Sequence, residues 1–296
     1  MKSAILIPLL ILLVQCLAAT PHKTTPPQEF GILLASFGTS DPAGRAAYAK
    51  IEDTVRERWP NSPIYWAYTS DFIRAKSLRN GVELDSPSVA LSKMSDAGIK
   101  RVVVQSLHII AGQEYEEITY AIHAYQGSHR AFDSVEIGMP LLASNADVLA
   151  CSQLMITEAD TIRKTGSALL FMGHGSKHHP ADLTYTATAA VLRDLDPQAY
   201  LATVESPAGF EKILNQFKAD QTKSVTLVPF MSVAGDHAKN DLAGDEPDSW
   251  KSQLEAAGIE CDVLLRGMGE FDGIIDIWIE HLANAVEALD ATEHES

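Results

Sequence analysis

The sequence predicts an α/β fold in which two similar doubly wound parallel-sheet domains face each other across a cleft. Three observations support this prediction: strand-like apolar runs alternate with helical patterns, the same strand types occur twice in the same order, and polar motifs follow the strand ends. The chain has 296 residues, of which 46% are hydrophobic and 21% are charged. This length and composition are sufficient for two globular domains of ordinary size.

Two apolar runs predict buried strands in the first half of the chain. Residues 30–37 read FGILLASF and lead into the polar turn Gly-Thr-Ser, as a buried parallel strand opening into a loop would. Residues 101–110 read RVVVQSLHII and are followed by Ala-Gly-Gln-Glu, which ends at Glu114. Each strand therefore ends in a polar motif.

The same two strand types return in the second half. Residues 167–172 read SALLFM and enter Gly-His-Gly-Ser around His174, and residues 224–233 read SVTLVPFMSV and enter Ala-Gly-Asp-His, which ends at His237. The chain is therefore interpreted as internally duplicated. Matching the two Ala-Gly pairs places Glu114 in the same structural position as His237.

Helical patterns separate these strands, and strands that alternate with helices predict parallel sheets with right-handed crossovers. The last pattern carries an apolar stripe and is interpreted as a packing helix. We expect an N-terminal domain over residues 30–143 and a C-terminal domain over residues 144–296. The helical patterns cover residues 43–59, 88–97, 114–125, 145–164, 183–195, 208–217 and 271–289.

The first 29 residues are expected to lie outside the fold. Lys2 precedes an almost unbroken apolar run over residues 4–14, which is typical of a secretory signal peptide and shorter than the roughly 20 residues of a membrane-spanning helix. We expect a signal peptide over residues 1–20, a leader over residues 21–29, and a periplasmic protein without a membrane span after processing. A transmembrane anchor and a lipoprotein attached through Cys16 are the alternatives.

The composition excludes several classes of partner. The formal charge of -16 and a pI of about 4.9 disfavour nucleic acid and anionic membranes, which both require basic patches. Cys151 and Cys261 are the cysteines expected after processing, and they lack the spacing of a thiolate metal site. An exported protein permits a disulfide between them, but the sequence carries no geometric information about it.

The strand-end motifs predict one site, because ligands of open parallel sheets bind outside the carboxyl ends of the strands. Facing halves would bring the loops of Gly38, Glu114, His174 and His237 to one interdomain cleft, where small-ligand sites are common. Two imidazoles and a carboxylate bind Co²⁺, Fe²⁺, Ni²⁺ or Zn²⁺ and can also accept protons. For either histidine alone, an ordinary loop histidine is an equally good interpretation.

Two further acidic residues are candidates for this site. Asp236 precedes His237 and could orient its ring. Glu205, in Val-Glu-Ser-Pro, follows a short apolar stretch and is a second candidate metal ligand. A solvated carboxylate after a strand is the alternative for Glu205.

In number and order, these motifs resemble the anaerobic sirohydrochlorin cobalt chelatases of the class II chelatase family. The resemblance extends from Gly31 to the final helix, and it implies two similar α/β domains with the tetrapyrrole between them. It implies ATP-independent insertion of Co²⁺ into sirohydrochlorin, in the cobalamin or sirohaem pathway, with Fe²⁺ as the alternative metal. The segments are GILLASFGTS, VVVQSLHIIAGQEYE, FMGHGSKHH, VESP and VPFMSVAGDHAKNDLAGDEPDSW.

The resemblance also implies roles for individual residues. His174, Glu205 and His237 are expected to bind the metal, while His174 and Glu114 are expected to be catalytic, with Glu114 as a ligand or proton acceptor. Metallation must also remove two pyrrole protons, and we hypothesise that these pass through the histidine and glutamate set. The division of roles between Glu114 and Glu205 stays open.

Other charged residues are weaker candidates, and a solvated surface position is the alternative for most of them. His108 is a core or a cleft residue, and His178 and His179 adjoin the Gly-His-Gly loop. His123 and His129 are candidates for an additional metal or haem at a contact between copies of the chain in a homo-oligomer. The candidate partners for the carboxylates of sirohydrochlorin are Arg45, Arg74, Lys76 and Lys177.

A non-enzymatic alternative is an exported protein of the solute-receptor type that binds or transports a metal ion or haem. Such a protein also places histidines between two α/β lobes, and it would explain export better than a chelatase does. The series of motifs favours the chelatase, and the sequence contains no metal-gathering loop rich in His and Asp.

Overall fold

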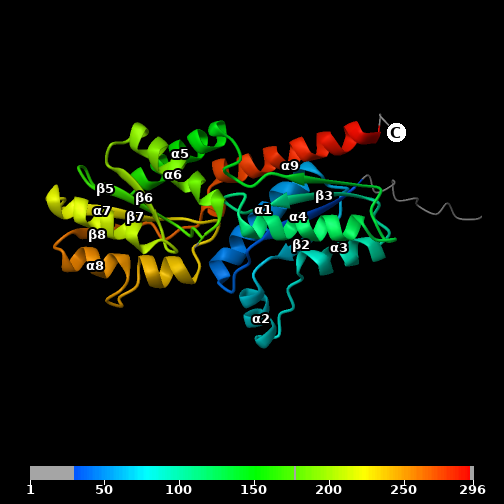
Figure 1. The fold of residues 1–296 in the computed structure, drawn as a ribbon, viewed down its shortest axis with the longest axis horizontal. Helices are drawn as coiled ribbons and strands as arrows, with labels where there is room; N and C mark the ends of the chain where they lie inside the picture. The colour runs from blue at the N-terminus through cyan, green and yellow to red at the C-terminus, as the bar shows by residue number, and fades with distance from the viewer. Residues whose placement is uncertain (1–29, 177, 294–296) are drawn as a thin grey trace, which may run out of the picture.

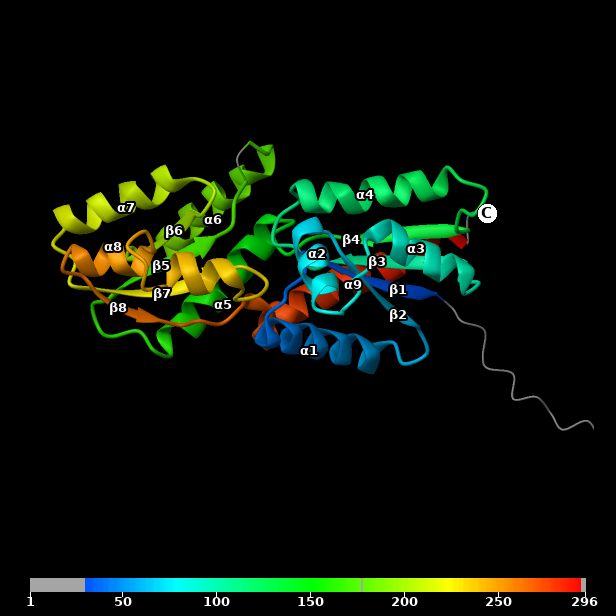
Figure 2. The same cartoon turned by 90° about the horizontal axis from the view of Figure 1, so that it is seen from below.

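The computed structural model describes residues 30–176 and 178–293, so the predicted signal peptide, the leader and Lys177 lie outside the described residues. The chain forms two four-stranded parallel sheets with flanking helices (Figures 1 and 2). The first sheet has the order β2-β1-β3-β4, with β1 Gly31–Ser36, β2 Ile64–Tyr68, β3 Arg101–Ser106 and β4 Ser134–Gly138. The second has the order β6-β5-β7-β8, with β5 Ala168–Gly173, β6 Ala199–Thr203, β7 Ser224–Phe230 and β8 Glu260–Val263.

Helices connect the strands on both sides of each sheet. The first half contains α1 Pro42–Arg58, α2 Asp71–Arg79, α3 Pro87–Asp96 and α4 Gln113–Gln126. The second contains α5 Asn145–Asp160, α6 Leu183–Leu195, α7 Pro207–Ala219 and α8 Trp250–Ala256, and α9 Asp272–Glu293 ends the described chain. Short helical turns cover Pro180–Asp182 (η1), Ala238–Leu242 (η2, a π-turn) and Met268–Glu270 (η3).

Side-chain caps explain where many of the helices begin. The side chains of Asp41, Ser70, Ser86, Ser144 and Ser249 each accept a hydrogen bond from a backbone N–H in the first turn of the helix that follows. These bonds satisfy donors that have no partner within the helix. The polar residues after the strands therefore end one element and start the next.

The two sheets have the same register, which confirms the predicted duplication at the level of the backbone. β1 and β5 are both six residues long, and Gly31 pairs with Val102 as Ala168 pairs with Val225. Glu114 and His237 lie the same number of residues after these β3 and β7 partners. The predicted fold class is correct.

The last helix returns to the first half of the molecule. Although α9 follows β8 of the second sheet, it lies along β3 and β4 of the first (Figure 1). Arg101 on β3 pairs with Asp290, and His281 Nδ1 lies 3.1 Å from the carbonyl oxygen of Met139 after β4. A boundary at residue 144 therefore assigns α9 to the second domain by sequence, whereas the strands on which it packs belong to the first.

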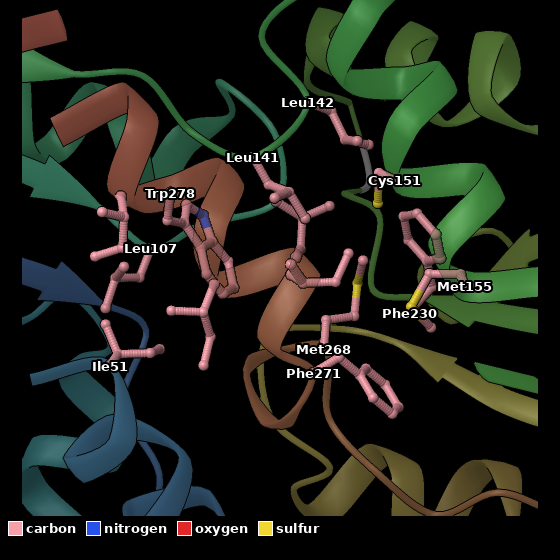
Figure 3. Close-up of a cluster of buried hydrophobic side chains, with 14 of the residues drawn as sticks. Ile51, Leu107, Leu141, Leu142, Cys151, Met155, Phe230, Met268, Phe271 and Trp278 are labelled. Carbon is pink, nitrogen blue, oxygen red and sulfur yellow. The ribbon is translucent and has the colours of Figure 1, made fainter. Parts of the chain in front are cut away.

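The returning helix also joins the two halves through one hydrophobic cluster (Figure 3). Trp278 of α9 is fully buried, and the cluster includes Leu107 from the first half and Phe230 from the second. Met268 and Phe271, just before α9, belong to the same cluster. Burial of apolar surface on this scale holds the two halves together as one body.

Candidate active site

A cavity of about 590 Å³ lies between the carboxyl ends of the two sheets, as the topology predicts. Both halves line it at the same three structural positions, directly after the first and second strands of each sheet and at the end of the loop that follows the third. The second half contributes His174, Glu205 and His237, and the first contributes Phe37, Ser70 and Glu114. All four residues predicted to be catalytic or metal-binding thus border one cavity.

His174 is presented by the turn that follows β5. Gly175 has a φ of 74°, a conformation that favours glycine, and a Cβ on Gly173 would come within 2.7 Å of Tyr185 Cε1. The two glycines of the motif are therefore required for different reasons. The Nδ1 of His174 donates to the carbonyl oxygen of Gly175 at 2.8 Å, which leaves Nε2 to act as a ligand.

His237 is oriented by a carboxylate, but that carboxylate is not Asp236. The Nδ1 of His237 lies 2.5 Å from Asp241 Oδ2, and Asp236 pairs with Lys76 instead. The prediction of Asp236 as the orienting residue is therefore wrong. The spacing of four residues in His-Ala-Lys-Asn-Asp could have indicated Asp241, because it brings both side chains to one face of the η2 turn.

The two histidines follow neighbouring strands of the second sheet, and their rings are in edge-to-face contact at the cavity. Their ring centroids are 4.9 Å apart with an interplanar angle of 83°. Each ring has its Nδ1 engaged by an acceptor, so both can offer Nε2 to a single ion. Within the described part of the chain, no group of three or more His, Cys, Asp or Glu side chains is arranged to hold a metal ion.

Glu205 is attached to the His174 turn through the backbone. Its N–H donates to the carbonyl oxygen of His174 at 3.0 Å, and its side chain lines the cavity. Its counterpart in the first half, Ser70, donates to the carbonyl oxygen of Phe37 at 3.2 Å. Glu205 therefore occupies a position that the repeated backbone fixes beside His174.

Glu114 enters the cavity from the first turn of α4. Its Oε2 is buried, and no described residue offers it a hydrogen bond. Burial, followed by the charge of Glu114, raises the pKa of the Glu117 carboxyl one turn along the helix. The Glu117 carboxyl therefore takes up a proton more readily than a solvated glutamate does.

His108 borders the cavity from the first half and is also a satisfied core residue. It is 7% exposed, and its Nδ1 and Nε2 lie 3.0 Å from Ser106 Oγ and 3.2 Å from Thr69 Oγ1. Burial lowers its pKa to about 4. The imidazole is therefore neutral at ordinary pH.

Apolar side chains form much of the remaining wall, which suits a flat, largely apolar ligand. The Phe37 ring lies 6.1 Å from the His174 ring, and Phe72 of α2 is 65% exposed at the cavity. The sequence prediction did not include Phe72, whose position after Ser70 was the available signal. The apolar lining consists of Phe37, Phe72, Ile73, Ile109, Ile110, Met231 and Val233.

Of the predicted carboxylate partners, Arg45, Arg74 and Lys76 are not in the wall, and Lys177 lies outside the described residues. The described residues that line the cavity include no arginine or lysine. Arg45 donates to the carbonyl oxygen of Ser40, and Arg74 binds the carbonyl oxygen of Thr69 at 2.7 Å and the Asp71 carboxylate.

The remaining histidines differ in their surroundings. His179 Nδ1 accepts the Ala181 N–H, and its Nε2 lies 3.2 Å from Glu116 of the first half, so it links the His174 loop to α4. His123, His129 and His178 are exposed. Cys151 and Cys261 are both free, so the disulfide that the sequence permits is not formed.

None of the helices in the described ranges is long and apolar enough to span a membrane.

The fold and the cleft define a class of protein: two similar α/β domains with a pair of imidazoles at neighbouring strand ends of one sheet, beside an interdomain cavity. The family model described as cobalt chelatase (CbiK) matches residues 30–287. The chain belongs to the cobalt chelatase (CbiK) family, and the family predicted from the sequence is correct.

Two curated relatives agree with this assignment. The sirohydrochlorin cobaltochelatase CbiKC of Nitratidesulfovibrio vulgaris strain Hildenborough is 38% identical over 270 residues, which cover 91% of this chain and 95% of the relative. The sirohydrochlorin cobaltochelatase of Salmonella typhimurium strain LT2 is 34% identical over 258 residues, covering 86% of this chain and 96% of the relative.

Solved structures share the fold at much lower identity. The sirohydrochlorin chelatase SirB of Bacillus subtilis subspecies spizizenii, solved with cobalt, has a TM-score of 0.57 at 12% identity and covers 87% of this chain and 95% of its own. SirB of Bacillus subtilis with Fe³⁺ has a TM-score of 0.56 at 12% identity, covering 90% and 97%. These similarities support the two-domain fold alone.

Proposed function

We propose that this protein is a sirohydrochlorin cobaltochelatase, which inserts Co²⁺ into sirohydrochlorin without ATP. The observation that carries the proposal is the pair of imidazoles of His174 and His237 in the second half, whose ring centroids lie 4.9 Å apart at the cavity between the two halves. Membership of the cobalt chelatase family and the two curated relatives support the same activity. In the family's reaction both the metal and the tetrapyrrole are substrates.

Metal capture is assigned to the second half. With Nδ1 of His174 held by a carbonyl oxygen and Nδ1 of His237 held by Asp241, both Nε2 atoms can bind Co²⁺ as it loses water. Glu205 is assigned as the third ligand, which closes on the ion once it is bound. This places the metal on one side of the tetrapyrrole.

Proton removal is assigned to Glu114. Two pyrrole protons must leave as the dication enters the ring, and a metal-ligating nitrogen cannot accept one of them at the same time. Glu114 comes from the opposite half, and its buried Oε2 has no hydrogen-bond donor among the described residues. Glu117, on the next turn of α4, then provides a route for the proton towards solvent.

The test compares initial rates of metallation of sirohydrochlorin with Co²⁺, Fe²⁺ and Ni²⁺, followed by visible absorbance. We expect the protein to accelerate insertion of Co²⁺, with Fe²⁺ as the second metal, because the same ligands accept both. A protein that binds Co²⁺ without accelerating insertion would instead be a metal-binding protein, and the proposed activity would be wrong.

We also propose that the protein acts in the periplasm, on the basis of the signal-peptide pattern over residues 1–20. Expression with and without these residues, followed by fractionation and mass measurement of the mature chain, tests this proposal. Absorbance of the purified protein in the haem region tests whether His123 or His129 holds haem between copies of the chain. Size-exclusion chromatography with light scattering measures the oligomeric state.

A further inference from the structure

The loop that carries His237 is tied to the first half of the molecule on both sides of the histidine. Directly before His237, Asp236 Oδ2 lies 2.9 Å from Lys76 Nζ of α2. Two residues after His237, Lys239 pairs with Asp41, the N-cap residue of α1. These two lysine–aspartate pairs are called the interdomain clamp below.

The backbone around His237 has few contacts that would hold it in place from within the second half. It runs through a bend between β7 and η2, and Gly235 in it has open space where a Cβ would lie. Within the second half, the ring of His237 is held by Asp241, which lies one helical turn further along the same segment rather than in the sheet. Contacts from the first half therefore hold the part of the loop around His237, beyond the backbone hydrogen bonds that Met268 and Gly269 donate to Met231 and Ser232 earlier in the loop.

The two ion pairs of the clamp lie at the surface and not in the hydrophobic core. The side chains of Lys76 and Asp236 are 32% and 56% exposed, and that of Lys239 is 43% exposed, whereas that of Asp41 is 13% exposed. Ion pairs made by lysines with this exposure contribute little to the stability of a fold. Their placement at residues 236 and 239, flanking a metal-ligand candidate across the cleft, is the feature that requires an explanation.

We propose that Lys76 and Lys239 are positioning residues for metallation, which hold the His237 loop against the first half. This inference rests on the proposed function. The clamp sets the position of His237 relative to both His174 and Glu114, so it determines how well the two imidazoles share an ion and how the metal faces the proton acceptor. Neither lysine is assigned a contact with the metal.

The experiment measures two quantities for a Lys76→Ala/Lys239→Ala double variant: Co²⁺ affinity without tetrapyrrole, and kcat and KM for sirohydrochlorin. The lysines are changed because Asp41 also caps α1. We expect Co²⁺ affinity and kcat each to fall roughly tenfold, the lower range for groups that orient metal ligands, with KM unchanged. The Lys76→Arg/Lys239→Arg variant keeps both charges and should restore most of the loss.

A matched control is Lys251→Ala, which removes a lysine that lies 3.2 Å from Asp245 within the second half alone. It should leave all three quantities unchanged. A raised KM for sirohydrochlorin with unchanged Co²⁺ affinity in the double variant would mean that the lysines bind substrate carboxylates, and would overturn the proposal. Unchanged values throughout would overturn it as well. If the wild-type protein binds Co²⁺ without metallating sirohydrochlorin, the proposed function fails, and Co²⁺ affinity alone still decides whether the clamp positions His237.

Discussion

The two halves of the molecule share one backbone framework but differ at the three positions that line the cleft. The first strand, the second strand and the third-strand loop of the second half present His174, Glu205 and His237, where the first half presents Phe37, Ser70 and Glu114. The identical register means that the backbone places these side chains equally well in both halves. Residue type alone therefore gives one half the two imidazoles and the carboxylate that we propose bind the metal, and gives the other an apolar wall with one carboxylate.

The largest effect is expected from removing either imidazole of the second half. In His174→Ala or His237→Ala, two ligands remain at most, so we expect the rate of Co²⁺ insertion to fall at least about a hundredfold, since metal ligands are rarely replaced by solvent without such loss. Initial-rate assays measure the effect. His178→Ala, an exposed histidine of the same loop, is the control, and an unaffected rate in both ligand variants would refute the division between the halves.

The second prediction separates the two glutamates that occupy different positions in the two halves. Glu114→Gln removes a proton acceptor of the same shape, and we expect kcat to fall roughly a hundredfold with Co²⁺ affinity unchanged. Glu205→Gln should weaken Co²⁺ binding measured without tetrapyrrole. If Glu114→Gln weakened Co²⁺ binding instead, both halves would supply metal ligands. The proposal that only the second half binds the metal would then be wrong.

The third prediction concerns His108, whose counterpart in the second half is Met231. Its pKa is lowered from 6.5 to about 4 by burial, so between these values the unfolded chain binds a proton that the folded chain does not. The contribution of the neutral His108 side chain to the free energy of unfolding is therefore complete above about pH 6.5, and it is lost as the pH falls towards 4. This loss amounts to something on the order of 3 kcal/mol.

Urea unfolding of wild type and His108→Met at several pH values measures this difference. Methionine cannot titrate, so the variant should lack this component of acid destabilisation, although it also loses the contacts to Ser106 and Thr69 at every pH. If the free energy of unfolding changed with pH in the same way for both proteins, folding would not lower the pKa of His108, and the prediction would be wrong.

The sequence was sufficient to predict the central strands but not the edges. β1, β3, β5 and β7 are continuous buried runs, which periodicity detects. The edge strands β4 and β8 are only partly buried, so their apolar pattern is weak. The return of α9 to the first sheet also leaves no local signal, because an apolar stripe does not specify which surface covers it.

The site shows the same limit. Its strand-end residues could be predicted because duplication places them at equivalent positions, and Glu114 was found only by that alignment. Asp241 was missed because adjacency in sequence favoured Asp236, whose side chain is instead drawn to Lys76 of the other half. Pairings across the cleft depend on tertiary structure, and no local pattern of residues encodes them.

The smallest effect is expected from the apolar wall that the first half supplies. Phe72 on α2 is 65% exposed in the absence of ligand, and an aromatic ring of this kind is stabilised by contact with a flat macrocycle. Because a single aromatic contact is worth about 1 kcal/mol, Phe72→Ala should raise KM for sirohydrochlorin about fivefold. Co²⁺ affinity should not change, because the proposed metal ligands come from the other half. Phe72→Leu, which keeps an apolar side chain without the ring, separates stacking from simple burial, and a loss of Co²⁺ affinity in either variant would mean that the two halves do not divide metal and macrocycle between them.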